Sequence, residues 1–122
     1  MKVAIVGSRG LGVECYEYLE RHVPAECAEI ISGGAAGVDT LAERYAKEKG
    51  LKLTVIRPDY KIFDRAAPIV RNGQIIRQAD YVLILWDGAS RGTRNVIMTC
   101  MKTDKPHKLL LIQGENEAND NG

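Results

Sequence analysis

The sequence has few of the residues that mark several common classes of protein. Its three cysteines (Cys15, Cys27 and Cys100) are odd in number and include no Cys-x-x-Cys pair. This pattern argues against a zinc site, a dithiol redox motif or a disulfide framework, and it favours buried thiols in a reducing cytosol. Aromatic residues are also scarce, at 6% of the chain, so a surface that binds single-stranded nucleic acid by base stacking has little to draw on.

A long apolar run and a strong net charge are missing as well. No segment approaches the roughly 20 apolar residues of a membrane span, and the apolar run before Gly7 is too short for a signal peptide. We therefore expect a soluble cytoplasmic protein without membrane association. The net charge of +1 gives no overall field toward DNA, yet residues 57–94 hold seven basic residues, six of them arginine, against four acids. Chance or a local anion-binding patch explains this bias.

Short apolar segments alternate with stretches of helical periodicity. Strands are predicted at residues 3–6, 28–32, 51–56, 81–86 and 108–112, and helices at residues 11–22, 38–49, 65–79 and from residue 93 onward. This order predicts an α/β fold, a single Rossmann-like three-layer domain. We expect about four helices to cover a five-stranded, mostly parallel sheet of order 3-2-1-4-5. The domain is expected to span residues 1–113, and the polar residues 114–122 to form a disordered tail.

Three loops rich in glycine and hydroxyl residues follow the first, second and fourth predicted strands, at residues 7–10, 32–39 and 87–93. In a sheet of this order such loops meet at one crevice, outside the carboxyl ends of the strands. Each loop also opens a predicted helix, whose N-terminal N–H groups and partial positive charge suit a phosphate or a carboxylate. Glycine in such a turn has a structural explanation too, but the convergence of three loops favours a bound anion.

Neither common nucleotide-binding fingerprint is present. The first loop reads GSRGLG, which is not GxGxxG, and GxxxxGK[ST] is absent, which argues against a P-loop NTPase. The three loops, together with Arg71-Asn72 between them, instead resemble the YspA-like branch of the SLOG superfamily, which is named for the Smf/DprA and LOG proteins. The resemblance covers nearly the whole chain up to Ile112. It implies a Rossmann-like fold that binds nucleotides or nucleotide-derived ligands, with no established reaction for this branch.

The resemblance also tests a specific mechanism. LOG-type enzymes resemble phosphoribohydrolases that release a base from a nucleoside monophosphate and carry a PGGxGTxxE signature. The matching residues 87–96 read DGASRGTRNV, so Gly92-Thr93 fits while Val96 occupies the acidic position. Because valine neither activates water nor stabilises a positive sugar ring, the hydrolase mechanism does not carry over unless Asp39 or Asp87 supplies the carboxylate.

The predicted site residues have functional and structural interpretations. Asp39 is expected to accept a ribose hydroxyl or act as a general base, or only to interact with the helix dipole. Asp87 is expected to bind a sugar, a base edge or a metal. Arg9 is expected to clamp a phosphate, and Ser90 to help bind one while capping a helix. The predicted ligand-binding set is Gly7, Ser8, Arg9, Ser32, Gly33, Gly34, Gly37, Asp39, Arg71, Asn72, Asp87, Ser90, Arg91, Gly92 and Thr93.

Three functions remain open from the sequence. The first is a domain that binds a small nucleotide as a sensor or processes it as a ligand, with no obligatory cofactor and no metal. The alternative is a hydrolase that cleaves the N-glycosidic or phosphoester bond of a nucleotide with Asp39 or Asp87. Single-stranded DNA binding, as in DprA, ranks last because the charge and the aromatic content are low. A homodimer is expected, because relatives of this fold commonly pair through helices.

Overall fold

The computed structural model describes residues 1–113 of the chain. The sequence prediction of a disordered tail at residues 114–122 lies outside the described residues.

Five strands form one sheet in which every neighbouring pair is parallel. The strands are β1 (Lys2–Gly7), β2 (Glu29–Ser32), β3 (Lys52–Val55), β4 (Tyr81–Trp86) and β5 (His107–Leu111). Their order is β3-β2-β1-β4-β5, which confirms the predicted topology and makes the sheet entirely parallel rather than mostly so. Strand order reverses at β1, where β2 lies on one side and β4 on the other.

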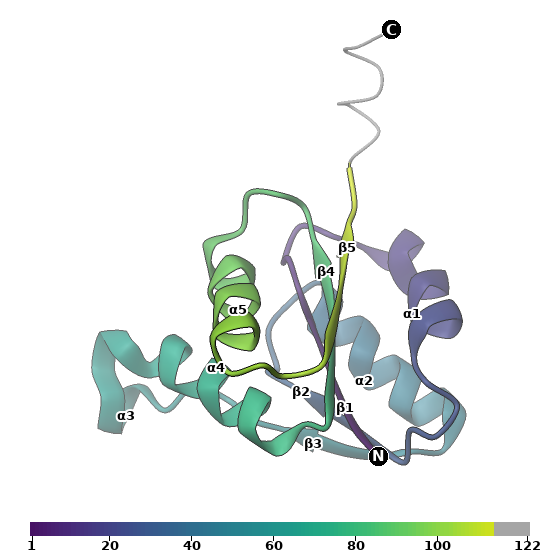
Figure 1. Ribbon diagram of the computed structural model, residues 1–122, viewed down its shortest axis with the longest axis horizontal. Helices are drawn as coiled ribbons and strands as arrows, with labels where there is room; N and C mark the ends of the chain where they lie inside the picture. The colour runs from purple at the N-terminus through teal and green to yellow at the C-terminus, as the bar shows by residue number, and fades with distance from the viewer. Residues whose placement is uncertain (114–122) are drawn as a thin grey trace, which may run out of the picture.

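Helices cover both faces of this sheet, as the alternating pattern predicts. Figure 1 shows α1 and α2 on one side and α4 and α5 on the other. The main helices are α1 (Tyr16–His22), α2 (Val38–Lys49), α4 (Ala67–Gln78) and α5 (Arg91–Lys102). Gly50 ends α2 in the left-handed conformation with a φ of 66°, and Pro68 lies in the first turn of α4.

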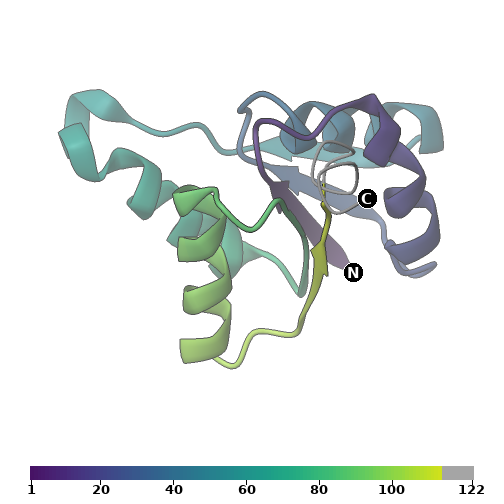
Figure 2. The same ribbon diagram turned by 90° about the horizontal axis from the view of Figure 1, so that it is seen from above.

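Two helical segments differ from the sequence expectation. The helix predicted over residues 11–22 begins later, because Gly12 is extended and a 3-10 turn (Val13–Cys15) precedes α1. A short helix, α3 (Tyr60–Phe63), also precedes α4, and the Asp59 carboxylate accepts the Ile62 N–H at 3.2 Å. In both ribbon views α3 projects away from the sheet (Figures 1 and 2). No helix within residues 1–113 has the length and apolar content needed to cross a membrane.

The side chains of β1 alternate between two hydrophobic cores. Val3 and Ile5 are fully buried in the core beneath α1 and α2, whereas Ala4 and Val6 belong to the core beneath α4 and α5. The second core includes Val96 of α5. Both cores therefore depend on β1, whose carboxyl end delivers the first glycine-rich loop to the point of strand-order reversal.

Candidate functional site

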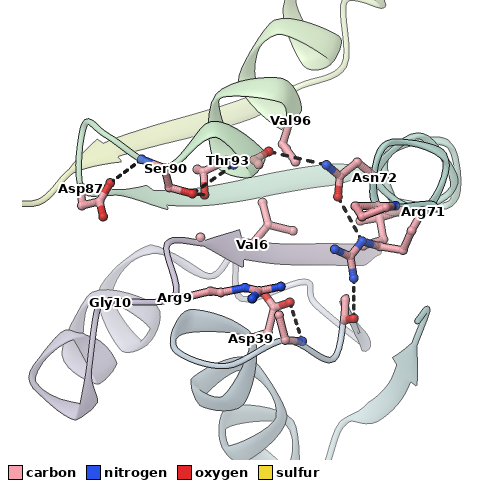
Figure 3. Close-up of a pocket in the computed structure, with 16 residues that line it drawn as sticks. Val6, Arg9, Gly10, Asp39, Arg71, Asn72, Asp87, Ser90, Thr93 and Val96 are labelled. Carbon is pink, nitrogen blue, oxygen red and sulfur yellow. Dashed lines mark hydrogen bonds between the residues drawn. The ribbon is translucent and has the colours of Figure 1, made fainter. Parts of the chain in front are cut away.

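A pocket of about 340 Å³ opens at the carboxyl ends of the strands, at this point of reversal. Figure 3 shows Arg9 and Asp39 on one side of Val6, and Ser90 and Thr93 on the other. Ten of the predicted site residues line the pocket: Gly7, Arg9, Gly33, Asp39, Arg71, Asn72, Asp87, Ser90, Gly92 and Thr93. The structure thus brings together all three predicted loops and the Arg71-Asn72 pair.

The other predicted site residues do not line the pocket but include supports for its loops. Ser8 is fully buried, and its hydroxyl oxygen accepts the backbone N–H of Asp87 at 3.0 Å, so it ties the first loop to the third. Ser32 is also fully buried, and its hydroxyl oxygen accepts the Gly34 N–H at 3.2 Å. Arg91, by contrast, is exposed at the start of α5.

The glycines of the second loop permit close backbone packing. Gly37 has a φ of 73°, and a Cβ there would lie 2.5 Å from the Arg9 carbonyl oxygen. A Cβ on Gly33 would lie 2.7 Å from Arg71 Nη1 and 2.9 Å from Asp39 Oδ2. Any side chain would therefore push apart the first two loops or the charged groups beside them.

Asp39 is a buried carboxylate at the pocket wall, with only 5% of the residue exposed. Its Oδ2 accepts the Ala35 N–H at 3.1 Å, while Oδ1 accepts no hydrogen bond from the described residues. Burial raises the pKa of Asp39, and the Ala35 hydrogen bond and the charge of Arg71 oppose that rise. Asp39 Oδ1 is thus an acceptor that lacks a partner within residues 1–113 and lies beside the pocket.

Arg71 and Asn72 connect the two walls of the pocket. Arg71 Nη1 donates to the Gly33 carbonyl at 2.6 Å, and its Nε donates to Asn72 Oδ1 at 3.1 Å. Asn72 in turn donates through Nδ2 to the Gly92 carbonyl at 3.5 Å (Figure 3) and to Asn95 Oδ1 at 3.1 Å. This chain of hydrogen bonds runs from the β2–α2 loop through α4 to the first turns of α5.

The N-terminus of α5 has two backbone donors that are free among the described residues, of which the one on Gly92 belongs to a residue that lines the pocket. Ser90 caps the helix, because its hydroxyl accepts the Thr93 N–H at 3.4 Å. The N–H groups of Arg91 and Gly92 have no acceptor within residues 1–113. With the partial positive charge of a helix start, these donors suit an anionic oxygen.

Asp87 holds the loop before α5. Its Oδ1 accepts the N–H groups of Ala89 at 2.8 Å and Ser90 at 2.9 Å. These two hydrogen bonds lower the pKa of Asp87, with a smaller contribution from Ser8. The lowered pKa makes Asp87 a weaker base than Asp39, whose pKa burial raises, and the two hydrogen bonds of Asp87 hold the loop in place.

The floor of the pocket is apolar, and the sequence analysis did not assign these residues to the site. Val6 at the end of β1 and Val96 of α5 are core residues whose edges remain open to the pocket, beside Pro68 and Ile75 of α4. The spacing of Pro68, Asn72 and Ile75 places them on one helical face, and this pattern was the available signal. Within residues 1–113, no cluster of three His, Cys, Asp or Glu side chains is arranged to hold a metal ion.

Comparison with known proteins gives a family and a fold. The model of the family described as "YspA, cpYpsA-related SLOG family" matches residues 1–63. Gene 61 protein of Mycobacterium phage D29 is 31% identical over 83 residues, which cover 63% of this chain and 66% of that protein, just under two thirds of its length.

Two solved structures of DNA processing protein A share the fold. The structure from Helicobacter pylori, described for its single-stranded DNA binding mode, has a TM-score of 0.72 and 24% identity, covering 100% of this chain and 73% of that one. The structure from Streptococcus pneumoniae has a TM-score of 0.71 and 20% identity, covering 93% of this chain and 50% of that one.

Proposed function

The chain belongs to the YspA, cpYpsA-related SLOG family, and on this premise we propose that it binds a nucleotide or nucleotide-derived small molecule in the pocket between β1, α4 and α5. The observation that carries the proposal is that three kinds of group line one cavity of about 340 Å³: a backbone donor, apolar side chains and a carboxylate. The N–H group of Gly92, which lines the pocket at the start of α5, suits a phosphate. The apolar edges of Val6 and Val96 suit a base, and Asp39 Oδ1 suits a sugar hydroxyl.

The first test is a thermal-shift and calorimetric screen of purified protein against nucleosides, nucleoside mono-, di- and triphosphates, dinucleotides and ADP-ribose derivatives. A ligand at 100 times its Kd stabilises the fold by about 2.7 kcal/mol. We expect phosphorylated compounds to stabilise the protein and the matching nucleosides to do so far less. If no nucleotide in a broad panel stabilises the protein, the proposal is wrong.

A second candidate function is hydrolysis of an N-glycosidic or phosphoester bond of the bound nucleotide. The Asp39 carboxylate lies at the pocket wall and burial raises its pKa, whereas hydrogen bonds lower the pKa of Asp87, so Asp39 is better suited to act as a general base. Product analysis after incubation should then show base or phosphate release that disappears in Asp39→Asn while binding survives. Equal turnover in wild type and Asp39→Asn would exclude this mechanism.

Nucleic acid is the less favoured ligand, although the structural neighbour from Helicobacter pylori binds single-stranded DNA. The net charge of +1 and the 6% aromatic content give this chain little electrostatic or stacking surface for a strand. We expect a fluorescent single-stranded oligonucleotide to show no salt-sensitive binding at micromolar concentrations of protein. Binding that weakens steeply with added salt would support the nucleic-acid function instead.

A further inference from the structure

Arg71 carries a positive charge that the described residues do not pair directly. Arg71 is half-buried. Its guanidinium donates two hydrogen bonds to uncharged acceptors, the Gly33 carbonyl at 2.6 Å and the Asn72 amide oxygen at 3.1 Å. Within residues 1–113 no carboxylate lies within ion-pair distance of it. Withdrawing a cation from water without a counter-ion is unfavourable, and burial accordingly lowers the pKa of Arg71.

The same guanidinium faces the pocket with one nitrogen unused. Nη2 has no acceptor among the described residues, while the other two nitrogens are fixed by their hydrogen bonds. Figure 3 shows the group held at the pocket edge between Asn72 and the β2–α2 loop. Because uncharged partners fix the Arg71 guanidinium in place, its positive charge and the N–H groups of Nη2 stay available to an incoming anion.

Arg9 adds a second positive charge to this wall. It lines the pocket and is exposed, and its charge contributes to the lowered pKa of Arg71. Asp39 lies on the same wall, and its charge acts on Arg71 in the opposite direction. Two guanidinium groups and one carboxylate leave this wall with a net positive charge, which an anionic group on a ligand would balance.

The N-terminus of α5 lies on the opposite wall. In Figure 3, Ser90 and Thr93 lie on one side of Val6, while Arg9 and Asp39 lie on the other. The apolar side chain of Val6 therefore separates two places that favour an anion, and Val96 extends this apolar surface. A ligand whose sugar or base covers Val6 therefore needs a separate anionic group at each wall in order to use both of them.

Resting on the proposed function, we infer that Arg9 and Arg71 form a second anion subsite opposite α5. The ligand it fits carries two anionic groups at opposite ends of a neutral sugar, as a nucleoside bisphosphate does. A nucleoside diphosphate has the same number of phosphates but places them together at one end. The two isomers therefore distinguish a subsite on the second wall from a general preference for charge.

The test is isothermal titration calorimetry with nucleoside 5′-monophosphates, 5′-diphosphates and 3′,5′-bisphosphates in the adenine and guanine series. Since charged hydrogen bonds are the strongest, the bisphosphate should bind about tenfold to hundredfold more tightly than the monophosphate. The diphosphate should gain less. Arg9→Gln, at an exposed side chain, and Arg71→Gln should each lower the ratio of bisphosphate to monophosphate affinity, with both affinities measured in the same variant.

Arg57→Gln is the matched control. Arg57 donates its Nη1 to the Gly34 carbonyl at 3.1 Å, next to the carbonyl that Arg71 holds, but it does not line the pocket. This variant should keep the bisphosphate gain. Equal affinity for mono- and bisphosphate, or a gain that survives in both Arg9→Gln and Arg71→Gln, would overturn the second subsite and leave nucleotide binding intact. Failure of every nucleotide to bind would remove both proposals.

Discussion

Gly92 and Gly73 separate a binding effect from a folding effect, because both are helical glycines at which an added Cβ meets no atom within 4 Å. Only Gly92 lines the pocket. Gly73→Ala should stabilise the protein by about 0.5–1 kcal/mol, and Gly92→Ala should not destabilise it. Gly92→Ala should weaken nucleotide binding at least tenfold, since its methyl group stands beside the donors of α5. Urea unfolding and calorimetry on both variants check this, and equal binding by the two would contradict it.

Asp39 should make stability depend on pH in the direction opposite to most carboxylates. Burial raises its pKa in the folded state, so the folded protein holds the proton more tightly than the unfolded chain. Below the unfolded pKa both states are protonated. As the pH rises from the unfolded pKa to the folded pKa, the unfolded chain releases its proton first, so the folded protein loses stability over this window. Asp39→Asn should therefore gain stability relative to wild type across that window and keep a constant advantage above it. Urea unfolding of both proteins from acidic to neutral pH measures this difference.

Asp87 supplies a control of opposite sign for that experiment. Its hydrogen bonds to Ala89 and Ser90 lower its pKa, so its stabilising contribution is present above the unfolded pKa and is lost as the pH falls through the folded one. Asp87→Asn should lose stability at neutral pH and approach wild type in acid. Parallel pH profiles for wild type and both variants would show that neither carboxyl group differs in pKa between the two states.

The first turn of α5 combines a helix cap with a predicted phosphate site, and substitutions at Ser90 divide these two roles. Ser90→Ala removes the oxygen that accepts the Thr93 N–H and should cost about 1 kcal/mol of stability. Ser90→Asp retains a good cap but places a negative charge at the pocket wall. It should keep the melting temperature near that of wild type while nucleotide binding falls more than tenfold. Undiminished binding by Ser90→Asp would show that the phosphate lies elsewhere.

For the whole molecule, the sequence predicts most of the architecture and part of the site. Alternating apolar and helical segments predict a parallel sheet covered on both faces, and the order β3-β2-β1-β4-β5 brings the three loops together. The pattern does not reveal that Ser8 supports a neighbouring loop, or that Arg71 is held by the carbonyl of Gly33, which lies 38 positions away in the chain. The pattern also does not show which core residues reach the pocket. Periodicity identifies the buried face of a helix but not the point at which that face meets a cavity, as it does at Val96.

The two hydrophobic cores should unfold together, because both are built on β1 and β4. Ile5 is fully buried toward α1 and α2, and Ile84 is fully buried toward α4 and α5. Ile5→Ala and Ile84→Ala should each cost about 2–5 kcal/mol. Each variant should still unfold in a single transition, with urea curves from Trp86 fluorescence and far-UV circular dichroism superimposing. Separate fluorescence and dichroism midpoints in either variant would mean that one face of the sheet can lose its packing while the other persists. A pocket whose walls come from both sides of β1 would then rest on two independent units rather than one.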